Sequence, residues 1–209
     1  MKRIDFVRWH RCCESLGATR RDTDGWHTRL LAAWSEPQRA YHTLQHLEEC
    51  LDLLDSSRCT QPSVVEMALW FHDAVYDPKA GDNEERSASM AAEALSDLGL
   101  SDSVVQSVRR LIMLTKTHHA GEEVDDGLLI DIDLAILGQS VERFDQYEEQ
   151  IRFEYSWVPS EVYREKRAEV LRGFLNRDQI FVTDQMRERF EQPARANLAR
   201  MVARMSGHS

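Results

Sequence analysis

Histidine and aspartate side chains recur along this chain beside apolar residues, where a polar group needs a partner. The six that stand out are His42, His46, His72, Asp73, Asp131 and Asp133. A shared metal ion is one partner that serves imidazole and carboxylate together. Two histidines with two carboxylates form a hard to borderline ligand set that suits Mn, Mg, Fe, Co or Zn. We therefore expect a divalent metal ion as cofactor, able to lower the pKa of a bound water beside a phosphate group.

The pair His72-Asp73 ends an apolar run of the sequence. A helix that begins at Pro62 places Val65, Leu69 and His72 on one face, which turns the imidazole toward the core. The alternative is a core histidine bonded to a backbone carbonyl, with Asp73 capping the segment that follows.

His42 and His46 lie four residues apart in a segment whose leucines predict a helix through residues 42–54. At that spacing both imidazoles share one face of the helix and can approach one metal ion or one substrate. A zinc protease would have a glutamate directly after the first histidine, and Thr43 holds that position. Thr43 at this position therefore argues against a zinc protease.

Asp131 and Asp133 lie inside the almost entirely apolar run 128–138. The pattern does not fit an amphipathic helix with both carboxylates on its solvent face, because the run has too few polar residues to form such a face. At least one of the two is expected to bind metal or to join a buried polar network.

Two further segments carry polar groups with two interpretations each. The loop 77–83 is rich in turn formers and oxygen ligands, and Asn83 followed by Glu84 can act at the site or simply start a helix. His118 and His119 follow a predicted helix end, where the alternative is a surface loop.

Helical periodicity predicts an all-α fold, since strand patterns are absent. The predicted helices cover about 4–16, 24–34, 42–54, 62–73, 84–98, 101–115, 141–155, 160–175 and 184–205. Pro193 is expected to kink or divide the last of them. We expect a single domain over 1–209, with a motif-bearing core at about 39–138 and flanking helices within 1–36 and 140–205.

The composition limits the classes of molecule that the protein is expected to bind. At 42% apolar residues the chain can bury a substantial core. Asp and Glu number 36 against 26 Lys and Arg, and no basic run is interleaved with aromatic residues, so long nucleic acid is not an expected partner. A small phosphorylated molecule can still bind, because a metal ion and a few local cations offset the global charge.

The four cysteines favour a reducing compartment. Cys12, Cys13, Cys50 and Cys59 show no C-x-x-C spacing, which is typical of reduced structural thiols. The first residues are charged and lack the apolar block of a secretory signal. No apolar stretch approaches the roughly 18 residues of a membrane span. We therefore expect a cytoplasmic protein that does not associate with membranes.

A histidine, an adjacent His-Asp pair and a later aspartate on a helical scaffold resemble the HD-domain superfamily of metal-dependent phosphohydrolases. The resemblance implies that His46, His72, Asp73 and Asp133 are the metal ligands. Tyr41-His42-x-x-x-His46 is similar to the cyclic-nucleotide phosphodiesterase branch, which implies that His42 donates a proton to the leaving oxygen.

The resemblance extends to a bacterial group of predicted stand-alone HD phosphohydrolases. Its motifs correspond to Tyr41–Leu47, Phe71–Asp77, Asn83–Ser87 and Asp131–Gly138. The superfamily pattern of a small residue, Asp and Leu fits Asp133 better than Asp131, which leaves Asp131 beside the site as a supporting residue.

The expected activity is hydrolysis of a phosphate ester or anhydride in a small molecule, with a nucleotide as the leading substrate. Candidates for positioning the water are Asp77, Glu84 and His118. Candidates for neutralising the phosphate are Arg39, Lys79, Arg86 and Lys116.

Two alternatives from other classes stay open. One is a regulatory HD module that binds metal and nucleotide without turnover. The other is a di-iron oxygenase, which needs a second metal site and for which His118 and His119 are the obvious histidines. The sequence also leaves open the substrate, the native metal, one ion against two, and the oligomeric state, with a homodimer as one option.

Overall fold

The computed structural model describes residues 4–19, 23–119, 121, 123 and 125–207. Within these residues the chain forms ten α-helices and one 3-10 helix and no strand, so the predicted all-α class is confirmed. None of the described helices is long and apolar enough to cross a membrane. Residues 1–3, which belong to the segment expected to lack a secretory signal, lie outside the described part.

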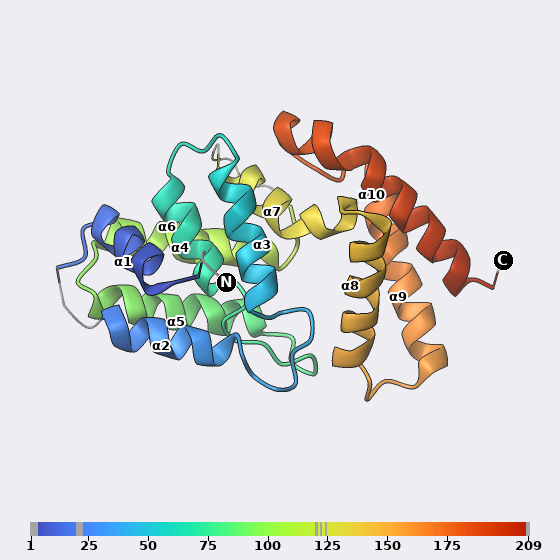
Figure 1. Ribbon diagram of the computed structural model, residues 1–209, viewed down its shortest axis with the longest axis horizontal. Helices are drawn as coiled ribbons and strands as arrows, with labels where there is room; N and C mark the ends of the chain where they lie inside the picture. The colour runs from blue at the N-terminus through green and yellow to red at the C-terminus, as the bar shows by residue number, and fades with distance from the viewer. Residues whose placement is uncertain (1–3, 20–22, 120, 122, 124, 208–209) are drawn as a thin grey trace. The chain divides into compact units, whose positions relative to one another are not determined.

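The chain forms two compact units, residues 1–129 and 130–209 (Figure 1). The boundary falls inside α7 (Asp126–Leu134). The single HD-type domain over 1–209 stays a prediction.

The first unit is built around α4, whose residues Val65–Phe71 are all buried. A helix that is apolar almost all round belongs in a core, and α4 packs against four neighbours. Trp34 Nε1 donates to the carbonyl of Trp70 at 3.0 Å and so fixes the end of α4 next to His72. The helices of this unit before α7 are α1 (Phe6–Ser15), α2 (Thr23–Ala33), α3 (Leu44–Asp55), α4 (Pro62–Phe71), α5 (Asn83–Asp97) and α6 (Asp102–Thr115).

Two helix starts differ from the prediction, and each difference moves a candidate residue. α3 begins at Leu44, because Thr43 is extended with φ −120° and ψ 179°, so His42 precedes the helix. The prediction that His42 and His46 share one helix face is therefore wrong. Asn83 is the first residue of α5 rather than its N-cap, a position that Asp82 occupies.

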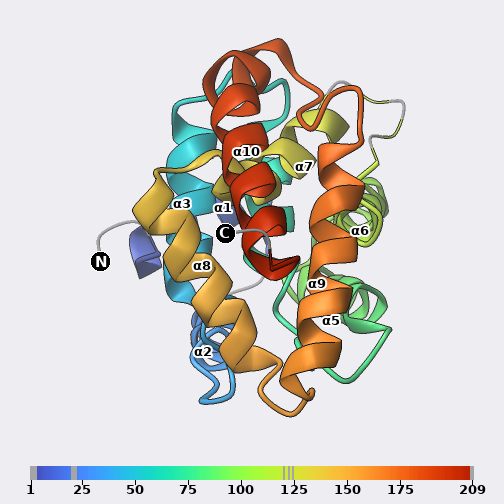
Figure 2. The same cartoon turned by 90° about the vertical axis from the view of Figure 1, so that its right-hand side faces the viewer.

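The second unit contains η1 (Ala135–Gly138), α8 (Val141–Glu154), α9 (Ser160–Leu175) and α10 (Asp184–Met205). α10 packs on α9 and on η1 (Figure 2), and it continues through Pro193 without dividing. A Cβ on Gly138 would lie 2.6 Å from the carbonyl oxygen of Phe190, so only glycine permits this approach of η1 to α10. Asn197 adds hydrogen bonds to the carbonyls of Leu137 and Gln139 at 3.0 and 2.9 Å.

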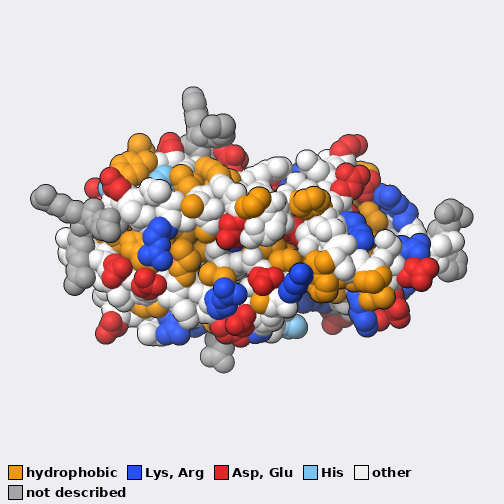
Figure 3. Space-filling model, turned by 90° about the horizontal axis from the view of Figure 1, so that it is seen from below, with side chains coloured by type: hydrophobic (Ala, Val, Ile, Leu, Met, Phe, Trp, Pro, Cys, Tyr) orange, Lys and Arg blue, Asp and Glu red, His pale blue; other side chains and the backbone are white. Residues whose placement is uncertain are grey.

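One face of the molecule carries charges of both signs. On the face drawn in Figure 3, acidic and basic side chains are interspersed among apolar ones. The whole sequence has 36 Asp and Glu against 26 Lys and Arg, which gives the formal net charge of −10.

Candidate metal centre

Three side chains of the first unit bring their polar atoms to one point. Nε2 of His46 lies 3.1 Å from Nε2 of His72. Oδ2 of Asp73 lies 3.2 Å from Nε2 of His72 and 3.8 Å from Nε2 of His46. Both histidines are buried, whereas the Asp73 side chain keeps 18% of its surface exposed. The cluster therefore has buried nitrogens and one carboxylate that solvent reaches.

These separations fit one metal ion. Metal–ligand bonds of about 2.1 Å at angles between about 90° and 110° place ligand atoms about 3.0–3.4 Å apart. The distances of 3.1 and 3.2 Å lie in that range, and the 3.8 Å distance exceeds it by a few tenths of an ångström. The donor set can therefore hold a divalent ion.

The tautomer of His72 supports the same conclusion. Its Nδ1 lies 2.8 Å from the carbonyl oxygen of Leu69, and only an N–H can donate to a carbonyl. In the neutral ring Nε2 then carries the lone pair and faces His46. Metal-binding histidines are oriented in this way by a hydrogen bond from the other ring nitrogen. The backbone bond expected for a simple core histidine is thus present, and it prepares Nε2 to bind metal.

Aromatic rings surround the two imidazoles. The ring of Trp34 lies 5.4 Å from His72 and 6.2 Å from His46, centroid to centroid. The ring of Tyr41 lies 4.6 Å from His46. These apolar faces exclude water from the nitrogens, which strengthens electrostatic interactions with a bound cation.

Arg39 holds together the two segments that carry the site. Its guanidinium donates to the carbonyls of Asp73 and Ala74 at 2.7 and 3.0 Å and to that of His42 at 3.2 Å. Nε donates to Glu36 at 2.9 Å, and Nη2 pairs with the same carboxylate at 2.9 Å. Four hydrogen bonds and an ion pair thus engage the guanidinium, and the side chain is fully buried, which makes Arg39 a positioning residue and not a phosphate ligand.

The Asn83–Ser87 motif clamps the turn after Asp73. Ser87 Oγ accepts from the N–H of Val75 at 3.0 Å and donates to its carbonyl at 3.3 Å. Four residues earlier on α5, Asn83 accepts from the N–H of Asp77 at 3.0 Å and donates to its carbonyl at 2.9 Å. The motif therefore fixes the backbone of the turn at Val75 and Asp77 by hydrogen bonds. The sequence did not reveal this role.

His42 stacks on Tyr76, a residue of the clamped turn. The two ring centroids are 4.0 Å apart with planes at 26°. The His42 ring also lies 6.2 Å from that of His46. The turn that carries Asp73 therefore also orients the imidazole that we expected to act as a proton donor.

Asp131 has a structural role in the second unit. Its carboxylate accepts from the N–H groups of Val182 and Thr183, both at 2.7 Å, and from the Thr183 hydroxyl at 2.6 Å. These residues directly precede α10, whose N-cap is Thr183, so Asp131 fixes the chain where it enters that helix. Burial raises the pKa of Asp131, and the hydrogen bonds from Thr183 oppose the rise.

Asp133 lies two residues further along α7, in the second unit, and its place among the metal ligands stays a prediction. Within its own unit, its charge helps to raise the pKa of Tyr147, a smaller effect than burial of that hydroxyl. Tyr147 accepts from Arg167 at 2.7 Å, and Arg167 also pairs with Glu148 at 2.7 Å. A buried polar network therefore lies near Asp133.

The remaining catalytic candidates are not brought into the His46 group within the described residues. Asp77 is exposed and accepts from the N–H of Lys79 at 2.9 Å. Glu84 lies in the first turn of α5. His118 follows α6 with a left-handed φ of 50°. Their proposed roles in positioning water stay predictions.

An open cavity of about 370 Å³ adjoins the clamped turn. Its lining comprises Glu36, Gln38, residues 74–78 and Arg86. Arg86 is half exposed and its nearest carboxylate, on Asp82, is 4.0 Å away. Lys116, by contrast, donates to the carbonyl of Gly81 at 3.1 Å and pairs with Glu85. Arg86 is therefore the better placed cation for a ligand in this cavity.

Comparison with protein-family models gives no match, and comparisons with curated proteins and with solved structures give none either. The fold and the site define an all-helical protein whose first unit contains a His/His/Asp group able to hold a divalent metal ion.

Proposed function

We propose that this protein is a metal-dependent phosphohydrolase of the HD-domain type, acting on a small phosphorylated molecule and most readily on a nucleotide phosphoester. The observation that carries the proposal is the convergence of His46 Nε2, His72 Nε2 and Asp73 Oδ2 within 3.1–3.8 Å. The motifs of the sequence supply the link to phosphate chemistry.

The ligand roles follow from the donor set. His46, His72 and Asp73 would hold the ion, and Asp133 is the fourth ligand that the sequence motif implies. A divalent ion there would supply Lewis-acid polarisation of the phosphoryl group and a water of lowered pKa. The exposed edge of Asp73 gives substrate and water their access.

The other roles belong to residues around the clamped turn. His42, oriented by Tyr76, protonates the leaving oxygen as the P–O bond breaks. Arg86 neutralises phosphate charge beside the cavity of about 370 Å³, which accepts the remainder of the substrate.

The experiment compares wild type with Asp73→Asn and with Asp97→Asn, an exposed control at the end of α5. Metal content is measured by elemental analysis and phosphate release is measured with a panel of nucleotides and phosphoesters in Mn²⁺. We expect wild type and Asp97→Asn to bind metal and release phosphate, and Asp73→Asn to lose both. Bound metal without hydrolysis of any compound would contradict the enzyme and support a regulatory module, and absence of metal binding would contradict the centre itself.

A further inference from the structure

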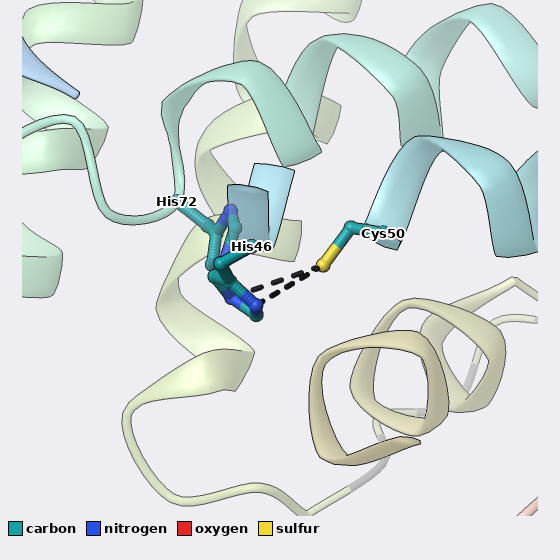
Figure 4. Close-up of side chains that lie close together, drawn as sticks. All are labelled: His46, Cys50 and His72. Atoms are coloured by element: carbon teal, nitrogen blue, oxygen red, sulfur yellow. Dashed lines mark hydrogen bonds between the residues drawn. The ribbon is translucent and has the colours of Figure 1, made fainter. Parts of the chain in front are cut away.

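The two histidines face a second candidate ligand on α3. Sγ of Cys50 lies 3.7 Å from Nδ1 and 3.8 Å from Nε2 of His46 (Figure 4). The ligand atoms of Cys50, His46 and His72 all lie within 4.8 Å of one another. Cys50 follows His46 by four residues, which places both side chains on the same face of the helix.

The sulfur-containing group differs from the Asp73 group in exposure. His46, Cys50 and His72 are 2%, 1% and 1% exposed, whereas the Asp73 side chain is 18% exposed. An ion held by Asp73 therefore keeps access to solvent and substrate, and an ion held by Cys50 is enclosed.

The two groups also differ in chemistry. A carboxylate prefers hard ions such as Mn²⁺ and Mg²⁺, and a thiolate prefers softer ones such as Zn²⁺ and Cd²⁺. Bonds of about 2.1 Å to nitrogen and about 2.3 Å to sulfur place these atoms about 3.1–3.6 Å apart on one ion. Sγ is therefore within a small side-chain movement of sharing an ion with His46.

We propose that Cys50 gives the centre a second ligand set, His46, His72 and Cys50, which captures a thiophilic divalent ion in competition with the set that contains Asp73. The inference rests on the proposed metal centre. As such an ion binds, the Cys50 thiol releases its proton to solvent and the thiolate forms the bond to the metal. Because the captured ion is enclosed, Zn²⁺ or Cd²⁺ inhibits an activity that Mn²⁺ supports.

The test titrates the full chain with Co²⁺ and records the thiolate-to-cobalt charge-transfer absorption in the near ultraviolet. Wild type, Cys50→Ser and the half-buried control Cys59→Ser are compared. We expect the band in wild type and in Cys59→Ser and its loss in Cys50→Ser, although all three bind Co²⁺. In parallel, Cys50→Ser should weaken Cd²⁺ binding about tenfold or more and change Mn²⁺ binding less than about twofold.

The outcomes separate this inference from the proposed function. Co²⁺ bound by wild type without a charge-transfer band, or a band that persists in Cys50→Ser, overturns the second ligand set and leaves the centre intact. Failure of wild type to bind Co²⁺ at all overturns both. A wild-type spectrum without the band overturns the second ligand set even if the Cys50→Ser variant does not fold.

Discussion

The hydroxyl of Ser87 binds both backbone polar groups of Val75, at 3.0 Å to the N–H and 3.3 Å to the carbonyl. Ser87 is fully buried and Val75 lies two residues after Asp73. One side chain on α5 therefore provides hydrogen-bond partners for both backbone groups of Val75, in the turn that leads out of the candidate metal centre. Its contribution is to the position of a ligand and not to the chemistry.

Ser87→Ala should destabilise the turn and weaken metal binding. Leaving the Val75 N–H and carbonyl unpaired costs about 1–3 kcal/mol, and supporting residues of metal ligands are typically worth about 10–100-fold in affinity. Chemical denaturation and Mn²⁺ titration measure the two effects. The control is Ser89→Ala on the same helix, whose exposed hydroxyl donates only to the carbonyl of Glu85 at 2.8 Å. Equal losses in both variants would contradict the clamp.

Asp131 and Asp133 should respond differently to the same substitution. In Asp131→Asn an amide replaces a carboxylate that accepts from three donors of Val182 and Thr183. We expect it to lower the free energy of unfolding by about 1–3 kcal/mol while metal is still bound. Asp133→Asn should lose metal. Elemental analysis beside thermal unfolding distinguishes the two, and the reverse pattern would exchange the roles of the two aspartates.

His42→Ala should slow hydrolysis in a manner that depends on the leaving group. A general acid is worth about 10²–10⁴-fold for a poor leaving group, and very little for 4-nitrophenolate, which departs without a proton. Metal content should not change. Steady-state rates with an alkyl and a 4-nitrophenyl phosphoester give the ratio, with His10→Ala as a histidine control at the α1–α2 contact. A loss of the same size with both substrates would exclude proton donation by His42.

Tyr163→Phe should stabilise the protein at neutral pH. The Tyr163 hydroxyl is buried and has no hydrogen-bond partner among the described residues, so its removal relieves about 1 kcal/mol. Burial also raises the pKa of Tyr163 to about 12, from its usual value of 10.0. The folded state therefore retains this proton where the unfolded chain has lost it. The stabilisation from the hydroxyl proton is complete below pH 10 and disappears between pH 10 and 12.

The advantage of Tyr163→Phe should therefore grow as the pH rises through that window, by roughly 1.4 kcal/mol for each unit of pKa shift. Urea denaturation of both proteins at neutral and alkaline pH measures the difference. A constant difference across the pH range would show that the phenol ionises equally in both states.

The sequence revealed the candidate ligands better than it revealed the residues that hold the surrounding backbone in place. His46, His72 and Asp73 could be selected because polar groups in apolar segments require partners, and the structure brings these three together. Cys50 had a usable signal, its four-residue spacing from His46. The start of α3 was predicted wrongly because the four-residue spacing of His42 and His46 suggests a helix, whereas Thr43 is extended and the helix begins with the first of its leucines, Leu44.

The residues that hold the backbone in place could not be derived from the sequence, because their hydrogen-bond partners are backbone groups far away along the chain. Arg39 carries a charge that suits phosphate, and nothing local indicates that its donors meet carbonyls 34 and 35 residues away. The role of Ser87 could not be derived either. In the sequence it is one small residue of a predicted helix, and its bond to Val75 exists only because the fold places the turn beside it. Asp131 acquires its structural role from residues 51 and 52 positions later.

The buried guanidinium of Arg39 also has a consequence for the order of folding. Its bonds to Asp73 and Ala74 form only when the intervening loop of about 35 residues has closed, and closing such a loop costs entropy before any contact compensates for it. A chain with α3 and α4 formed but this loop open has His46 on one segment and His72 with Asp73 on another, and the two segments move independently. Metal capture by all three ligands is therefore a late event that reports completion of the first unit.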